Sequence, residues 1–208
     1  MRIAIGTVVG VLALLGIAAS VGHYFVEPYN PGFLEFPAIT NAHVILGAVF
    51  LAFAPLQFVG QVRARALGYH RWAGRLLVAV GLVVGATALF LGLVVPFSGN
   101  GERLVIGLFG GLFLASLVKG VVHIGDGQVA AHRAWMMRAF AIGLSIATMR
   151  LVFIPALVIA GNPTDQQIAV LSNLSFTVAF VLHVGVAELW LRRGGARRVA
   201  PRVSPSTA

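Results

Sequence analysis

Long runs of apolar residues, separated by short polar segments, make up most of the chain. Six of these runs are long enough to form a helix across the hydrocarbon core of a bilayer, which takes about 20 helical residues. The runs cover residues 3–22, 40–60, 73–96, 104–123, 135–160 and 167–191. The pattern predicts an all-α integral membrane bundle of six transmembrane helices.

The first apolar run also has the form of a secretory signal peptide. Arg2 precedes it, and it ends on Ala18, Ala19 and Ser20, which are small residues of the kind found at cleavage sites. The run is longer than the apolar region of a usual signal peptide. We therefore expect a retained helix rather than a cleaved leader.

Composition supports lipid as the solvent of the chain. Of its 208 residues, 59% are hydrophobic and only 10% are charged, whereas about 25% of the residues in a soluble domain are charged. We expect one membrane domain at residues 1–193, followed by a disordered cytoplasmic tail at 194–208 that is rich in Arg, Pro and Ser. The chain has no cysteine, which excludes disulfides, thiolate metal sites and cysteine nucleophiles.

The basic residues gather on one side of the predicted membrane. With the N-terminus inside, 13 of the 15 Lys and Arg residues fall in cytoplasmic segments, and four of the six acidic residues fall outside. This positive-inside pattern predicts a protein of the cell membrane with both termini in the cytoplasm. The net charge of +9 then reflects topology and contact with anionic lipid headgroups, and it does not require nucleic acid as a partner.

Two short segments of the chain are alike. Residues 68–75 read Gly-Tyr-His-Arg-Trp-Ala-Gly-Arg, and residues 131–138 read Ala-His-Arg-Ala-Trp-Met-Met-Arg. Both place His-Arg, then Trp, then Arg at the cytoplasmic start of an outward-going helix. The simplest explanation is a duplicated helical hairpin, so that spans two to five form a four-helix core flanked by the first and sixth spans.

A set of motifs is spread over the last five predicted spans. They are His43, Pro55-Leu56-Gln57-Phe58, Arg63-x-Arg65, His70-Arg71-x-x-Gly74-Arg75, His132-Arg133-x-Trp135-Met136-x-Arg138 and Arg150. Taken together, these motifs resemble the bacterial predicted membrane proteins catalogued as domain of unknown function 2306. The resemblance implies a multi-pass membrane fold, and it implies no particular biochemical activity.

His70 and His132 are the first candidates for a cofactor site. In an up-and-down bundle, the third and fifth spans face each other across the axis, and both histidines lie at the cytoplasmic mouth. Two such imidazoles suit axial ligation of haem b, and nearby arginines suit its propionates. Those arginines are Arg71, Arg75, Arg133 and Arg138. The layout resembles that of the transmembrane b-type cytochromes, with one haem station in place of two.

The same motifs have a simpler interpretation. His, Arg and Trp side chains at a helix end also anchor the helix in the headgroup layer. His123 and His183 add two imidazoles toward the inner side, which makes a metal site conceivable. The histidines lack the i, i+4 spacing of a local metal site, and a packing role is the expectation for each of them singly.

Arg150 is the strongest single functional candidate. It lies within the fifth predicted span, where an arginine costs at least about 2.5 kcal/mol. Either it extends outward to the headgroups, or a partner compensates its charge. The candidate partners are His43, Ser172, Asn173 and a bound anionic or carbonyl ligand. A quinone carbonyl held between His43 and Arg150 is the specific form of this hypothesis.

The sequence leaves two functions open. The first is a redox membrane protein that binds one haem b or a quinone. The alternative is a non-enzymatic protein that binds or transports an anionic lipid or solute at the cytoplasmic face. The sequence has no phosphate-binding loop, nucleophile elbow or zinc-protease signature, so it does not decide whether the protein is an enzyme.

Overall fold

The structure, a computed structural model, describes residues 2–25 and 32–199. Within these residues the backbone forms helices and the turns between them, without a strand. The elements in chain order are α1 (Arg2–Gly22), α2 (Gly32–Glu35), α3 (Pro37–Phe53), the 3-10 helix η1 (Ala54–Phe58), α4 (Gly60–Arg65), α5 (Leu67–Val94), α6 (Asn100–Gly125), α7 (Val129–Ala160) and α8 (Asp165–Val199). The all-α class predicted from the sequence is confirmed.

Five helical segments of the described chain are long and apolar enough to cross a membrane. They are Pro37–Phe58, Leu67–Val94, Asn100–Gly125, Val129–Ala160 and Asp165–Gly194. The apolar part of α1, Gly6–Gly22, is shorter than any of them, and it falls below the length of about 20 residues that a hydrocarbon core requires. Five of the six predicted spans are therefore confirmed, and the first is not.

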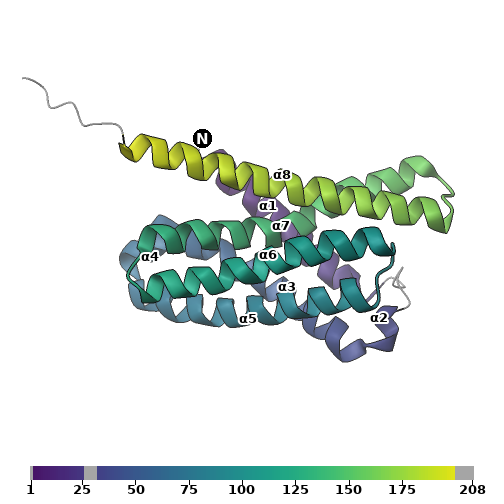
Figure 1. The fold of residues 1–208 in the computed structure, drawn as a ribbon, viewed down its shortest axis with the longest axis horizontal. Helices are drawn as coiled ribbons and strands as arrows, with labels where there is room; N and C mark the ends of the chain where they lie inside the picture. Colours follow the sequence, from purple (N-terminus) through teal and green to yellow (C-terminus); the bar gives the residue numbers. More distant parts are fainter. Residues whose placement is uncertain (1, 26–31, 200–208) are drawn as a thin grey trace, which may run out of the picture.

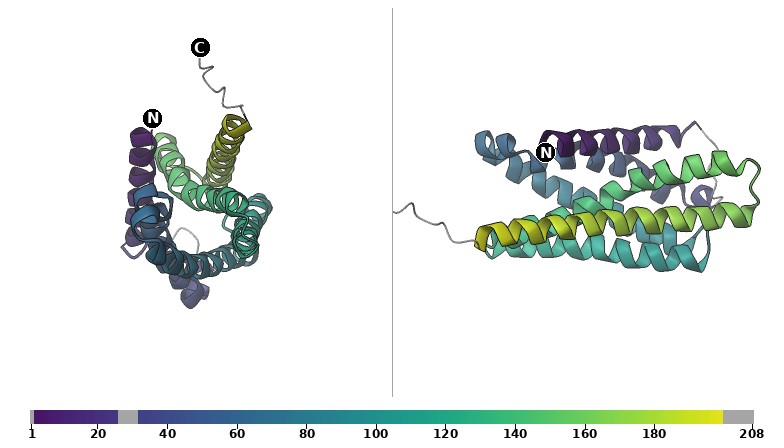
Figure 2. Two further views of the ribbon diagram at one scale, coloured as in Figure 1. Left: turned by 90° about the vertical axis from the view of Figure 1, so that its left-hand side faces the viewer. Right: turned by 90° about the horizontal axis from the view of Figure 1, so that it is seen from above.

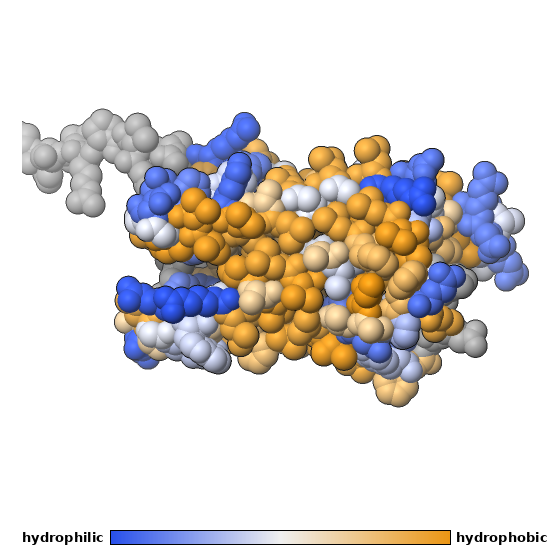
Figure 3. Space-filling model, turned by 60° about the horizontal axis from the view of Figure 1, so that its bottom comes forward, coloured by the Kyte–Doolittle hydropathy of each residue, from blue (hydrophilic) through white to orange (hydrophobic). Residues whose placement is uncertain are grey.

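The surface has the polarity of a protein that is solvated by lipid. Figure 3 shows a broad hydrophobic band across the middle of one face, with hydrophilic residues gathered toward both ends. On α8, Leu174, Val181 and Leu182 expose more than half of their surface. Apolar surface of this extent would be unstable in water, and it is the face that a bilayer accepts.

The helices pack as a ring in chain order. Each of α3, α5, α6 and α7 packs against the next, α1 packs against both α3 and α7, and α8 packs mainly against α7 and less against α6. Figure 2 shows this arrangement end-on, and Figure 1 shows the helices running between the two ends of the bundle. The helix α1 closes this ring between α3 and α7, so the ring contains α1 besides the four helices of the core that the sequence predicted.

Short turns make neighbouring helices antiparallel and define two ends of the bundle. The α5–α6 and α7–α8 turns lie at what we call the outer end, and α4 and the α6–α7 turn lie at the inner end (Figure 1). Gly99, Gly127 and Gly161 occupy these three turns with φ of 69°, 72° and 70°. Glycine adopts this left-handed backbone without the penalty that a Cβ brings, which allows each chain reversal to be short.

Aromatic side chains fill the centre of the bundle. Phe50 of α3 meets Phe113 of α6 edge to face, with ring centroids 5.8 Å apart, and both side chains are buried. Gly143 of α7 lies beside them, where a Cβ would come within 3.0 Å of the Phe50 ring. The lack of a side chain at Gly143 makes room for the Phe50 ring against α7.

The last helix is longer than the sequence predicted. The helix α8 continues through Gly194, where the expected tail begins, and ends at Val199. Residues 200–208 of that expected tail lie outside the described residues.

Candidate functional site

His43 and Arg150 occupy the same depth in the outer half of the bundle. His43 precedes Phe50 by seven residues in α3, and Arg150 follows Gly143 by seven residues in α7. Because α3 and α7 run in opposite directions, both steps lead about 10 Å, or two helical turns, toward the outer end. The two side chains proposed as a pair from the sequence therefore lie at the same depth of the bundle.

His43 is held in place by α5. Its Nδ1 lies 3.2 Å from the carbonyl oxygen of Val84 and 3.2 Å from Oγ1 of Thr87. The Thr87 hydroxyl in turn lies 2.8 Å from the carbonyl oxygen of Val83, to which it donates. Because the Val84 carbonyl only accepts, Nδ1 carries the proton, and Nε2 of the neutral ring keeps its lone pair. The imidazole is thus oriented, and its Nε2 is an acceptor.

Arg150 lacks a charged partner within the described part of the chain. Its Nη1 donates to the carbonyl oxygen of Ile146, one turn back in the same helix, at 3.2 Å. The ion pair that the structure records in the described residues joins Arg138 to Glu188 instead. An arginine has five N–H donors and stays protonated in proteins, so Arg150 keeps donors and a positive charge for a ligand.

The other two proposed partners of Arg150 have different surroundings. Asn173 of α8 donates from Nδ2 to the carbonyl oxygen of Ser98 at 3.1 Å, and its amide lies against Gly101 at the start of α6. Ser172 is buried on α8. Asn173 therefore joins α8 to the outer end of α6.

The outer end of α1 adds a third polar side chain to this region. A Cβ at Gly16 would lie 2.5 Å from Leu51 of α3 and 3.6 Å from Ala147 of α7, so α1 packs closely between these helices. His23 follows Gly16 by seven residues, which carries it about 10 Å outward. Its ring meets that of Phe33 edge-on, with ring centroids 6.2 Å apart.

The two His-Arg motifs take equivalent positions at the inner end. Each histidine is the fourth residue of its helix, His70 in α5 and His132 in α7. Their backbone N–H groups donate to Ala66 and Gln128, respectively, each at 3.0 Å. The two motifs thus occupy the same position at the starts of their helices.

The His132 side chain points to the neighbouring helix α6. Its Nδ1 lies 2.7 Å from the carbonyl oxygen of Gly120. A carbonyl can only accept, so Nδ1 is protonated and Nε2 keeps a lone pair. A histidine that ligates a metal through Nε2 is commonly oriented by such a second hydrogen bond. His132 thus fits the part of a haem ligand, with a partner on α6.

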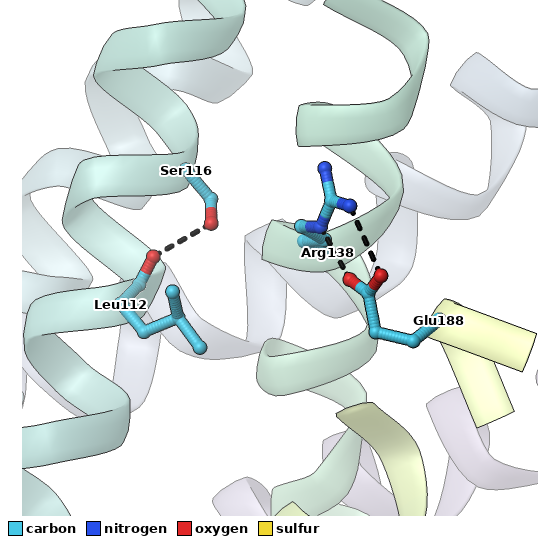
Figure 4. Close-up of polar contacts among 4 residues, drawn as sticks. All are labelled: Leu112, Ser116, Arg138 and Glu188. Atoms are coloured by element: carbon cyan, nitrogen blue, oxygen red, sulfur yellow. Dashed lines mark hydrogen bonds and ion pairs between the residues drawn. The ribbon is translucent and has the colours of Figure 1, made fainter. Parts of the chain in front are cut away.

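Arg138 takes part in an ion pair between α7 and α8. Its Nε and Nη2 donate to the two carboxylate oxygens of Glu188, as Figure 4 shows. The Arg138 guanidinium also lies 4.5 Å from the ring centroid of Trp135, and the Lys119 ammonium lies 4.6 Å from the same centroid. A haem propionate at Arg138 would therefore have to compete with Glu188.

The remaining inner candidates are mostly on the surface. Arg71, Arg75 and Arg133 are exposed. His123 is half-buried, with Nδ1 2.9 Å from Oε1 of Gln128 in the following turn. No group of three or more His, Cys, Asp or Glu residues in the described ranges is arranged to hold a metal ion, so the four-histidine metal cluster considered from the sequence is not assembled.

Several buried hydroxyl groups are satisfied locally or between helices. Ser116 donates to the carbonyl oxygen of Leu112 in its own helix at 2.6 Å (Figure 4). Thr148 of α7 lies 2.8 Å from Nε2 of His183 on α8, which gives His183 the packing role expected of it. These groups already have hydrogen-bond partners and need no ligand.

Thr87 is the site residue that the sequence analysis did not identify. It is the one hydroxyl residue in the predicted span 73–96, and this isolation in an apolar run is the signal that would have identified it. Its role depends on the rotation of α5 about its axis, which directs Thr87 toward His43 of α3.

These features define a multi-pass α-helical membrane protein. It has five long apolar helices in its described part, a lipid-compatible surface and a core with few polar groups. The family model described as predicted membrane protein, DUF2306, matches residues 40–191, about three quarters of the chain. The chain belongs to this family, as the sequence motifs indicated. No curated protein and no solved structure matches the chain.

Proposed function

We propose that the protein lies in the cell membrane with both termini in the cytoplasm. The inner end carries the exposed basic residues Arg71, Arg75 and Arg133, which suit the cytoplasmic leaflet and its anionic headgroups. The helix α1 has 21 residues, or about 31 Å of helix, and it serves as a sixth span.

The proposed function is that of a redox membrane protein that binds a quinone in the outer half of the bundle. The observation that carries this proposal is the placement of a protonated arginine, without a charged partner among the described residues, at the same depth as an oriented histidine. A quinone carbonyl accepts a hydrogen bond from Arg150, and a quinol hydroxyl donates to Nε2 of His43. A membrane-soluble ring needs such polar groups within apolar walls.

The two side chains have different parts in this chemistry. When the quinol hydroxyl ionises, Nε2 of His43 accepts the proton, because Nδ1 is already hydrogen-bonded to α5. Arg150 stabilises the negative charge on the ligand oxygen through charge-assisted hydrogen bonds. The same pair therefore binds both the oxidised and the reduced form of the ring.

A binding titration of the purified protein in nanodiscs with a short-chain quinone tests this function. We expect Arg150→Gln to weaken quinone binding at least tenfold, and Arg150→Lys to retain part of it. Arg103→Gln is the matched control, since Arg103 is an exposed outer arginine that donates to Leu93 and Asn100. Equal binding by the wild type and Arg150→Gln, with unchanged melting temperatures, would rule out this site.

A second candidate function is haem binding at the inner end. It is favoured by the hydrogen bond from His132 Nδ1 to Gly120, which leaves Nε2 for iron, and by the equivalent position of His70 in α5. Exposed arginines would bind the propionates: Arg71, Arg75 and Arg133. Haem would supply one-electron chemistry, and these side chains would hold and orient it.

The haem proposal has a direct spectroscopic test. Protein expressed with ample haem is purified, and its absorption is recorded air-oxidised and after reduction with dithionite. Haem ligation predicts a Soret band that sharpens on reduction and is lost in His70→Ala or His132→Ala. A colourless protein in this assay that also fails to bind quinone would instead favour the alternative, binding of anionic lipid or solute at the cytoplasmic face.

A further inference from the structure

Lys119 of α6 and Trp135 of α7 meet near the inner end of the bundle. The Lys119 ammonium lies 4.6 Å from the centroid of the Trp135 ring. Lys119 precedes the end of α6 at Gly125 by six residues, and Trp135 follows the start of α7 at Val129 by six residues. Both residues therefore lie about 9 Å from the turn that joins these antiparallel helices. Because the 26 residues of α6 span about 39 Å, against about 30 Å of hydrocarbon, this depth falls near the inner boundary of the hydrocarbon core.

Lys119 lies on the lipid-facing side of α6. Its side chain is exposed, and so are those of its neighbours Val118, Val121 and Val122. Lysine and tryptophan are suited to this layer, because each has an apolar body and a polar end that reaches the headgroups. The acyl chains of a lipid can pack beside these valines while its headgroup meets the ammonium.

The positive charge of Lys119 is left for an anion from outside the chain. Arg138 is a second cation at the Trp135 ring, 4.5 Å from its centroid, and Glu188 already matches its charge (Figure 4). Among the described side chains, the Trp135 ring is the recorded partner of Lys119. Asp126 lies seven residues further along α6, about 10 Å closer to the inner end, and the structure records no ion pair between it and Lys119.

We propose that Lys119 and Trp135 form a binding site for the phosphate of an anionic phospholipid in the leaflet at the inner end. The ammonium donates charge-assisted hydrogen bonds to a phosphate oxygen, and the indole N–H of Trp135 is a further donor. The ring holds the ammonium in place by a cation–π contact before the lipid binds. A zwitterionic headgroup adds a cation of its own, so the site favours a headgroup with a net negative charge. It lies at the opposite end of the bundle from the proposed quinone site and does not depend on it.

Two lipids with the same acyl chains test the site. The full-length protein in detergent is titrated with dioleoylphosphatidylglycerol and with dioleoylphosphatidylcholine, and native mass spectrometry measures the bound lipid. We expect the wild type to bind phosphatidylglycerol at least fivefold more tightly. Lys119→Gln should lose most of this preference, and Lys119→Arg should retain it. Arg75→Gln is the matched control, because it removes one charge from an exposed position of α5, and it should also retain the preference.

The outcomes distinguish this site from the general charge of the inner end. Loss of the preference in Lys119→Gln together with its retention in Arg75→Gln supports the proposal. Equal losses in both variants, or no preference in the wild type, overturn it. Displacement of phosphatidylglycerol by millimolar inorganic phosphate would assign the site to a free anion and overturn the assignment to a lipid.

A second measurement leaves Lys119 unchanged. Phosphatidylglycerol brominated in its acyl chains should quench the tryptophan fluorescence of the protein more than brominated phosphatidylcholine does. That excess should disappear in Trp135→Phe and persist in Trp72→Phe, which changes the exposed tryptophan of the equivalent motif. An excess that survives Trp135→Phe would place the bound lipid elsewhere and overturn the proposal.

Discussion

Arg138 and Glu188 form a two-pronged ion pair that ties α7 to α8, across 50 residues of sequence. The two side chains keep 24% and 32% of their surface exposed, so the pair lies at the edge of the bundle. Trp135 beneath the guanidinium limits its freedom to move. The sequence analysis assigned Arg138 to a haem propionate, and the structure gives it a carboxylate from its own chain.

We predict that Arg138→Met destabilises the bundle by about 1–2 kcal/mol. The substitution leaves the Glu188 carboxylate half-buried without its partner, and a hydrogen bond to a charged group contributes about 1.5–3 kcal/mol. Thermal unfolding in detergent measures the effect. Arg75→Met, at an exposed arginine of the other motif, is the control and should change the melting temperature little. Similar shifts for both variants would contradict the prediction.

The contact between Gly92 and Ile106 sets the spacing of α5 and α6. A Cβ at Gly92 would lie 2.5 Å from Cγ2 and 2.8 Å from Cβ of the buried Ile106. Ile106 is branched at Cβ and has little rotamer freedom in a helix. We therefore expect Gly92→Ala to destabilise the protein by about 1–3 kcal/mol through overpacking.

Gly47→Ala is the matched control for this contact, because a Cβ at Gly47 in α3 meets nothing within 4 Å. Its melting temperature should equal or exceed that of the wild type, since alanine favours the helix. If Gly92→Ala were as stable as Gly47→Ala, the contact between Gly92 and Ile106 would not set the spacing of α5 and α6.

The hydrogen bond between Thr148 and His183 is expected to contribute little to stability. Interhelical hydrogen bonds in membranes contribute about 0.6 kcal/mol on average, so Thr148→Val should lower stability by about that amount. Thr148→Ser keeps the hydroxyl and should stay closer to the wild type. A double-mutant cycle with His183→Leu measures the coupling, and a coupling near zero would show that the two side chains do not interact.

Topology is open to a labelling experiment because the chain has no cysteine. With a membrane-impermeant maleimide, Asn162→Cys in the α7–α8 turn should be labelled on intact cells, and Ala130→Cys at the start of α7 only after permeabilisation. A tag at the N-terminus should be protected on intact cells if α1 is a sixth span. An exposed tag with the same cysteine pattern would mean that α1 does not cross the membrane.

Much of the architecture was predictable from hydropathy alone. The last five predicted spans coincide with helices of the structure, because a backbone in lipid must satisfy its own hydrogen bonds within a helix. The predicted ends of the spans were less accurate than their existence. The helix α5 begins at Leu67 rather than 73, since His70 and Arg71 continue the helix at its polar end. The helix α3 changes to a 3-10 turn at Ala54, next to Pro55.

The common depth of His43 and Arg150 was also within reach of the sequence. Both residues are polar positions in apolar spans, and spans of opposite direction bring them to one depth. Membership of the family and the basic inner end likewise follow from residues and their order.

Only the tertiary structure decided which faces of the helices meet. A helix in lipid is apolar on all sides, so hydropathy does not mark its inward face as it does in a soluble protein. The sequence therefore did not show that Thr87 supports His43 or that Glu188 pairs with Arg138. Each of these contacts depends on helix rotation, which close packing around Gly16, Gly92 and Gly143 determines.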